Sequence, residues 1–353
     1  MPARLMSLLY GRTHASKSSL LGTFATGLWR EQGLKTRLYS GDGGGWLPMQ
    51  HLVDAGVLDA WDLSEHIHPF ETVNDAVRGA WPVDKADPAS PLRPLWLPQW
   101  KVLCPKCGNG GQPKLIATIE KAPVPGNVCP TCKGLTVSEL ERRANPDNSL
   151  DSYGAVFFEG LTAFSGMFLE NMSDRSAKGE KMGEEVAVKF KDGDLPVGGY
   201  SRSSYGVAQR KPLNAVKASR HLPVPYVFWT ALLEKGKDDK GDWTTAGSPT
   251  YGPKLAGSAA TDDAPREFGP LFYVVNIKGE RRLYVKTYFE PVSDIPHPAG
   301  TRLPAVVLDG VPDFYKFDPS NATLLWDVVA DIEKRLERAK GLLKPKGQPE
   351  VKK

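Results

Sequence analysis

The sequence predicts an α/β protein with a mainly parallel central sheet and one inserted zinc-binding segment. Three observations lead to this fold class. A strand, a loop, a helix and a second strand follow one another within residues 4–40, in the order of a βαβ unit. Two later apolar runs, "YGAVFF" at 153–158 and "VPYVFWT" at 224–230, have the length and composition of buried parallel strands. Between the first unit and these runs lie four cysteines in two C-x-x-C pairs, the arrangement of a metal-binding insert.

Bulk composition narrows the class of protein. With 353 residues the chain can bury a large core, as one large domain or two smaller ones. The net charge of +4 neither requires nor opposes a polyanionic partner. No apolar run reaches the roughly 18–20 residues that span a bilayer, and "MPARLMSLLYG" fits a buried first strand better than a signal peptide. Paired cysteines that bind a metal suit a reducing compartment, so we expect a cytoplasmic protein with no membrane partner.

The apolar periodicity predicts the remaining elements. In the first hundred residues it predicts, in chain order, a strand at 4–10, a helix at 18–33 that ends on a glycine, a strand at 36–40, helices at 47–66 and 70–81, and an ordered proline-rich connector at 82–100. After the cysteines it predicts helices at 137–144, 211–221 and 321–343, the two strands above, and a hairpin of 271–277 with 281–287. Residues 235–266 are polar and predict a mobile loop, and the tail "KPKGQPEVKK" predicts disorder.

The stretch "LLYGRTHASKSSLL", residues 8–21, approximates the phosphate-binding pattern G-x-x-x-x-G-K-[ST] between a strand and a helix. In such a loop, backbone N–H groups surround the β-phosphate, a lysine reaches the β- and γ-oxygens, and a hydroxyl binds Mg²⁺. Lys17 and Ser18 suit the last two roles. The expected nucleotide contacts are Gly11, Arg12, Thr13, His14, Ala15, Ser16, Lys17, Ser18 and Ser19.

Ser16 departs from this pattern, because it stands in place of a glycine. The position usually takes a positive φ, which costs a serine roughly 1 kcal/mol or more. Such a cost weakens a site without abolishing it. The alternative interpretation is an ordinary turn in which Ser16 or Ser18 caps the helix that follows.

Three polar residues near the ends of other predicted strands form a candidate catalytic set with Lys17. Glu159 ends the third strand and would hold Mg²⁺ together with Ser18. Asp42 follows the second strand and would orient the attacking water, although an aspartate in "GDGGG" also forms turns. Thr230 lies where a γ-phosphate sensor would be, and is otherwise the last polar residue of a core strand.

The order of these motifs resembles that of the RecA-like, P-loop ATP-binding proteins of bacteriophages, a group that includes ATPases of single-strand annealing and recombination. The resemblance rests on "LLYGRTHASKSS", "RLYSGDGG", "AVFFEGLTAF", "YGVAQRKPLNAVKASRHLPVPYVFWTALLEKG" and "YGPKLAGSAA…FGPLFYVVNI", and it covers most of residues 4–305 outside the cysteine insert. It implies ATP or ADP with Mg²⁺ as ligands and a role in DNA metabolism in the host cytoplasm. It also implies single-stranded DNA, other phage DNA-metabolism proteins and further copies of the chain as partners.

On this resemblance the chain divides into residues 1–100 as the first part of a RecA-like core, 101–150 as a zinc-ribbon insert, 151–315 as the second part of the core, and 316–353 as a C-terminal helix and basic tail. Besides Ser16, the sequence departs from the family at several positions. Asp42 stands where glutamate is expected, Glu159 where aspartate is, and Leu232 where histidine is frequent. "GTRLP" at 300–304 keeps only Arg302 of a usual basic element. These departures predict slow hydrolysis rather than a loss of binding.

The four cysteines form two knuckles with the spacing of a zinc ribbon. Cys104-x2-Cys107 and Cys129-x2-Cys132 are separated by 21 residues, and tetrahedral Zn²⁺ takes four thiolates. The alternatives are two disulfides or two redox-active pairs. Because no open ligand position or nearby histidine is evident, we expect a structural zinc. Lysines make the segment mildly basic, which fits a contact surface and a solvated surface equally.

These signals leave competing functions. Basic residues and tyrosines in 175–220 would suit a surface for single-stranded DNA, and the acidic residues between them suit a solvated face instead. Arg281, Arg282 and Arg302 are each candidates to act on the nucleotide of a neighbouring subunit. The leading function is an ATP-binding, ATP-hydrolysing protein of DNA recombination, annealing or replication. The second is a non-hydrolysing nucleotide-binding assembly or adaptor protein whose zinc ribbon binds a partner. A small-molecule kinase is disfavoured, because the sequence offers no basic lid helix.

Overall fold

The computed structural model describes residues 5–64, 96–109, 112–119, 126–144, 150–167, 202–235, 251–255, 264–289, 296–300, 303–318 and 320–343. Several predictions lie outside these residues: the helix at 70–81, most of the connector at 82–100, most of the polar loop at 235–266, the first part of the basic segment at 175–220, Arg302 and the tail.

A nine-stranded sheet forms the centre of the protein. Its strands follow the order β14-β11-β10-β1-β8-β7-β2-β3, with β9 paired to β8. The strands are β1 (Leu5–Gly11), β2 (Lys35–Ser40), β3 (Leu58–Asp62), β7 (Tyr153–Glu159), β8 (Tyr226–Lys235), β9 (Tyr251–Pro253), β10 (Leu271–Ile277), β11 (Glu280–Tyr284) and β14 (Phe314–Lys316). The run from β10 to β3 is parallel throughout, and β9, β11 and β14 join antiparallel. The predicted α/β class with a mainly parallel sheet is confirmed.

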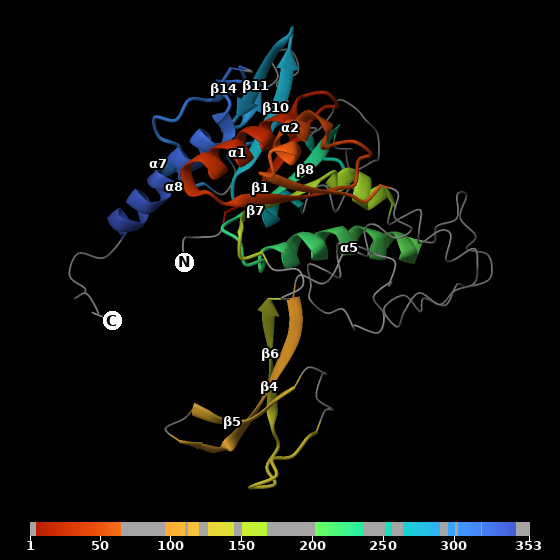
Figure 1. The fold of residues 1–353 in the computed structure, drawn as a ribbon, viewed down its shortest axis with the longest axis vertical. Coiled ribbons are helices and arrows are strands. Elements are labelled where there is room, and N and C mark those ends of the chain that lie inside the picture. Colours follow the sequence, from red (N-terminus) through yellow and green to blue (C-terminus); the bar gives the residue numbers. More distant parts are fainter. Residues whose placement is uncertain are drawn as a thin grey trace.

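Helices cover both faces of this sheet. α1 (Lys17–Gln32) and α8 (Leu324–Leu343) pack against one face, and α5 (Arg202–Ser219) packs against the other (Figure 1). α1 and α8 meet where Trp326 contacts Phe24, with ring centroids 5.4 Å apart. A Cβ atom at Gly27 would lie 2.2 Å from Trp326, so this approach requires glycine. The shorter helical elements are η1 (Leu47–Met49), α2 (Gln50–Asp54), η5 (Ala264–Glu267) and α7 (Ala305–Leu308).

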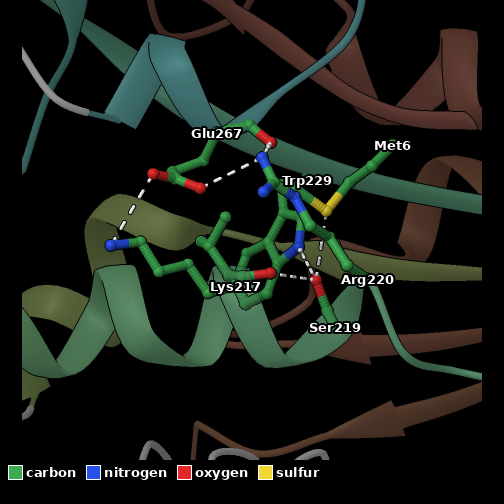
Figure 2. A network of polar contacts seen from close by, with 7 residues as sticks. Met6, Lys217, Ser219, Arg220, Trp229 and Glu267 are labelled. Carbon is green, nitrogen blue, oxygen red and sulfur yellow. Dashed lines mark hydrogen bonds and ion pairs between the residues drawn. The ribbon is translucent and has the colours of Figure 1, made fainter.

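A small polar network connects the C-terminal end of α5 to the sheet (Figure 2). The indole Nε1 of Trp229 on β8 donates to Ser219 Oγ at 3.1 Å in the interior. At the surface, Glu267 forms ion pairs with Lys217 at 3.7 Å and with Arg220 at 3.0 Å. Two of the cations predicted for a DNA surface therefore have carboxylate partners.

The cysteine segment forms a separate three-stranded antiparallel sheet, which lies apart from the nine-stranded sheet (Figure 1). Its order is β5 (Gln112–Ile119), β4 (Trp96–Asn109), β6 (Val137–Ala144). A further two-stranded pair joins β12 (Tyr288–Phe289) to β13 (Pro296–His297). No helix in the described part of the chain is long and apolar enough to cross a membrane.

Two helix predictions are wrong. The helix predicted at 47–66 ends early. Residues 47–54 form η1 and α2, and Gly56, with a φ of 68°, follows this helical segment. Residues 58–62 then form β3, which pairs in parallel with β2. Residues 137–144 are strand β6 rather than a helix, because they pair with β4 along their whole length. The glutamate, leucine and arginine residues of "VSELERRA" favour a helix locally, and tertiary pairing overrides that preference.

Candidate functional site

The loops that follow β1, β2, β7 and β8 converge on one cavity of about 350 Å³. Because these strands are parallel, their carboxyl ends lie at the same edge of the sheet, where ligands of open α/β sheets usually bind. Residues 13–19 line the cavity, and so do the other three members of the predicted catalytic set, Asp42, Glu159 and Thr230. Four segments that are far apart in the sequence thus line one cavity.

Two of the predicted nucleotide contacts do not line this cavity. Arg12 is exposed beside it, and Gly11 is buried at the end of β1. A Cβ atom at Gly11 would lie 2.1 Å from the carbonyl oxygen of Val274 on β10. Glycine is therefore required at this position by the close pairing of two strands, whatever the loop binds.

The loop backbone adopts the conformation that the glycine pattern requires. Ser16 has φ 72° and ψ 30°, in the left-handed region, and His14 has φ 60°. Ser16 immediately precedes α1, yet its side chain makes no capping hydrogen bond. The alternative in which the Ser16 side chain caps the helix is therefore wrong, and the serine bears the conformational cost expected from the sequence.

Lys17 crosses the loop above the end of β1. Its Nζ donates to the carbonyl oxygens of Arg12 at 3.0 Å and Gly11 at 3.3 Å. Burial lowers the pKa of Lys17, and the neighbouring carboxylates of Glu159 and Asp42 oppose that shift. An anion in the cavity would be a stronger acceptor for this ammonium than two neutral carbonyl groups.

Glu159 is the most constrained carboxyl group of the cavity, with only 4% of its surface exposed. Its Oε1 accepts a hydrogen bond from Ser18 Oγ, whereas its Oε2 is buried and has no partner among the described residues. The pKa of Glu159 is raised to about 7, chiefly by burial; the hydrogen bond from Ser18 lowers it, the charge of Asp42 raises it and the charge of Lys17 lowers it. A buried carboxylate oxygen without a partner, next to a hydroxyl, is a donor set that suits a hard cation such as Mg²⁺.

Asp42 lies across the cavity in the loop after β2. Burial raises the pKa of its carboxyl group, and Lys17 opposes this shift. The backbone carbonyl of Asp42 accepts hydrogen bonds from Ser40 Oγ at 2.8 Å and from Gly45 N–H at 2.9 Å. The residue therefore belongs to a turn, as the alternative interpretation held, and also presents its carboxyl group to the cavity.

The hydroxyl groups of Thr230 and Thr162 connect the ends of β7 and β8. Thr230 Oγ1 accepts from Gly160 N–H, and Thr162 Oγ1 accepts from Leu232 N–H, both at 2.9 Å. Thr162 Oγ1 also donates to the backbone carbonyl of Lys254 at 2.7 Å, so its hydroxyl hydrogen already has an acceptor within the protein. The hydroxyl hydrogen of Thr230 has no acceptor among the described residues, which leaves it free to donate into the cavity.

Gly45 and Arg281 line the cavity, although the sequence had not assigned either of them to this site. A Cβ atom at Gly45 would lie 2.9 Å from Glu159 Oε2, so this glycine of "GDGGG" leaves room beside the carboxylate. Arg281 reaches the cavity from β11 of the same chain, although the sequence had offered it only as a residue acting on a neighbour.

The four cysteines form a second site in the three-stranded sheet. Their sulfur atoms all lie within 4.8 Å of one another, with Cys104–Cys132 at 3.5 Å and Cys107–Cys129 at 3.7 Å. A tetrahedral ion with metal–sulfur bonds of about 2.3 Å separates its ligands by roughly 3.8 Å. All four thiols are free, and a disulfide would need sulfur atoms about 2.05 Å apart. The cluster therefore can hold one metal ion such as zinc, and it contains no disulfide.

The knuckle backbone favours the thiolate form at two of these sulfur atoms, those of Cys129 and Cys132. Cys107 N–H donates to Cys104 Sγ at 3.3 Å. Backbone N–H groups of Cys132 and then Thr131 lower the pKa of Cys129 to about 6. The N–H of Gly134 likewise lowers the pKa of Cys132. Thiolates are the form that zinc binds, so the turns favour metal binding as well as the correct geometry.

No protein family matches the chain, and no curated protein matches it at a significant level.

Proposed function

We propose that the protein is a RecA-like P-loop ATPase of bacteriophage type, which binds ATP with Mg²⁺ in the cavity at the carboxyl edge of the sheet. The observation that carries the proposal is the convergence of a loop–helix phosphate motif, a buried carboxylate and a second carboxylate from three different strands. Residues 13–16 would offer backbone N–H groups, Lys17 would contact the β- and γ-oxygens, and Ser18 with Glu159 would hold the metal. The parallel order of the strands around β1 supports the same fold.

Hydrolysis would follow from the same arrangement. Asp42 would orient a water and accept its proton as the water oxygen bonds to the γ-phosphorus. The bond between that phosphorus and the β–γ bridging oxygen breaks, which releases ADP and phosphate. Bound Mg²⁺ would supply charge neutralisation at the phosphate oxygens. Asp42 is one methylene shorter than glutamate, and the burial that raises its pKa leaves it a stronger base than an ordinary aspartate.

The role in DNA metabolism rests on the resemblance of the motif order to phage recombination and annealing ATPases. Single-stranded DNA, other phage proteins and further copies of the chain are the proposed partners. We expect slow turnover that single-stranded DNA stimulates, because such a protein assembles on its substrate.

Equilibrium binding of ATP with Mg²⁺, followed by turnover with and without single-stranded DNA, tests this function. Lys17→Ala should abolish ATP binding, whereas Lys35→Ala, which removes an equal charge at the opposite edge of the sheet, should bind as wild type does. Asp42→Asn should bind ATP and lose turnover, since a general base is not needed in the ground state. Tight ATP binding by Lys17→Ala would mean that the nucleotide binds elsewhere. Full turnover by Asp42→Asn would mean that Asp42 is a turn residue with no role in hydrolysis.

A second function is favoured by one feature of the three-stranded sheet. Leu115, Leu103 and Val137 lie opposite one another across β5, β4 and β6, and Leu115 and Val137 are 51% and 47% exposed. Val128 and Leu135, paired in an isolated bridge, are 55% and 71% exposed. An exposed apolar surface of this kind suits an adaptor protein that contacts a partner through its ribbon while ATP only fixes a conformation. ATP binding without turnover, at every DNA and protein concentration, would decide for this second function.

A further inference from the structure

A basic side chain reaches the cavity from the strand pair beyond β1. Arg281 lines the cavity together with Lys17 and Glu159. It lies on β11, which pairs with β10, and β10 pairs with β1 on the side away from β8. β1 ends opposite Val274, whereas β10 continues to Ile277, so the β10–β11 hairpin extends past the end of β1 (Figure 1). This extension brings Arg281 to the level of the loop between β1 and α1.

Strand alternation separates Arg281 from its neighbour Arg282. Successive side chains of a strand point to opposite faces of the sheet. Leu283 belongs to the apolar cluster under α1 and α8, so Arg281, two positions before it, shares the face of α1. Arg282 shares the other face with Tyr284, whose ring belongs to the cluster under α5. Only one of the two arginines is therefore directed to the side on which the loop enters its helix.

The two arginines also differ in their partners. Arg282 donates to Glu280 Oε1 at 2.5 Å, and its guanidinium lies 4.5 Å from the ring centroid of Phe314. In the described part of the chain, no carboxylate lies within ion-pair distance of Arg281. Its guanidinium is 5.8 Å from the ring of Phe317, near the outer limit of a cation–π contact. Arg282 is thus held by the fold, whereas Arg281 is available to an anion.

We propose that Arg281 contacts the terminal phosphate of a nucleotide bound in the cavity of its own chain. This assignment rests on the proposed ATP-binding function. The loop N–H groups would surround the β-phosphate and Lys17 would reach the β- and γ-oxygens, but the two cavity carboxylates oppose an anionic ligand, so a second basic side chain beside the γ-phosphate would offset their charge. A guanidinium suits that place, because it stays charged and binds phosphate oxygens in pairs. The site is then complete in one chain.

A matched pair of charge-removing variants tests the assignment. Arg281→Gln removes the cation that lines the cavity, and Lys278→Gln removes one from the exposed turn of the same hairpin. ATPγS and ADP affinities are measured with Mg²⁺ for both variants and for the wild type, with zinc content and circular dichroism as checks of the fold. We expect Arg281→Gln to weaken ATPγS binding by about tenfold and ADP binding by less than about threefold. Lys278→Gln should change both affinities by less than about twofold.

Two results would overturn the assignment while leaving ATP binding intact. One is wild-type ATPγS affinity in Arg281→Gln, and the other is an equal loss of ATPγS and ADP affinity, which would move the contact away from the terminal phosphate. A wild-type protein that binds neither nucleotide would instead refute the proposed function, and the assignment with it.

Mixing variants distinguishes action within one chain from action on a neighbour. Lys17→Ala retains Arg281 but should not bind nucleotide, so it can supply the arginine only to a neighbouring subunit. Added in excess to Arg281→Gln, it should leave the weakened ATPγS affinity unchanged. Recovery of wild-type affinity in the mixture would mean that Arg281 acts on the neighbouring subunit, and the assignment to its own chain would be wrong.

Discussion

Removing the charge of Glu159 should make the metal-free protein more stable at neutral pH. The folded protein raises the pKa of this carboxyl group from an ordinary 4.5 to about 7, chiefly through burial. Between these values the unfolded chain releases the proton and the folded chain keeps it, so stability falls as the pH rises from about 4.5 to about 7. At about 1.4 kcal/mol for each pKa unit, the full loss amounts to about 3 kcal/mol above pH 7. Below pH 4.5 the group is protonated in both states and the effect vanishes.

Glu159→Gln removes this loss, because an amide does not ionise and can still accept from Ser18 Oγ. The difference in free energy of unfolding between variant and wild type should be near zero at pH 4.5 and approach about 3 kcal/mol in favour of the variant at pH 8. Urea denaturation at several pH values, in buffer without Mg²⁺, measures it. Glu31→Gln, at the exposed end of α1, is the control and should show no such trend. A difference that stays constant with pH would mean that the fold does not disfavour the ionised carboxylate.

Two further predictions concern the loop and the cysteines. Ser16→Gly should raise the free energy of unfolding by roughly 0.5–1 kcal/mol without weakening ATP binding, because the φ of 72° suits glycine. Ser16→Ala is the control. Equal free energies of unfolding for the two variants would show that backbone strain is not involved. Metal analysis of protein purified under reducing conditions should find one zinc per chain, and Cys107→Ser with Cys132→Ser should lose it. Zinc retained by this double variant would place the metal elsewhere.

The sequence was a good guide where a single local signal determines the structure. β7 and β8 are continuous apolar runs bounded by polar residues, and only a buried strand suits them. The loop before α1 and the two cysteine knuckles were found because their chemistry requires fixed spacings. β3 and β6 were missed because their strand character comes from a partner strand, β2 or β4, that lies far away in the chain.

Arg281 shows why spatial proximity was harder to predict than the identity of site residues. Its approach to the cavity depends on β10 lying beside β1, on the hairpin extending beyond β1, and on the alternation that separates it from Arg282. None of these is visible in "KGERRLY", where the two arginines look equivalent. Strand order and register decide which of two adjacent identical residues can serve the site.

The position of the cysteine sheet in the chain explains how two sites coexist in one protein. β4, β5 and β6 are inserted between β3 and β7, which both belong to the nine-stranded sheet. The cavity is built instead by the segments that follow β1, β2, β7 and β8, and none of its lining residues comes from the insert. Metal loss should therefore unfold the three-stranded sheet and leave the cavity in place, because the core clusters beneath the cavity contain no residue of that sheet. An insert at this point leaves unaltered the residues that would bind the nucleotide.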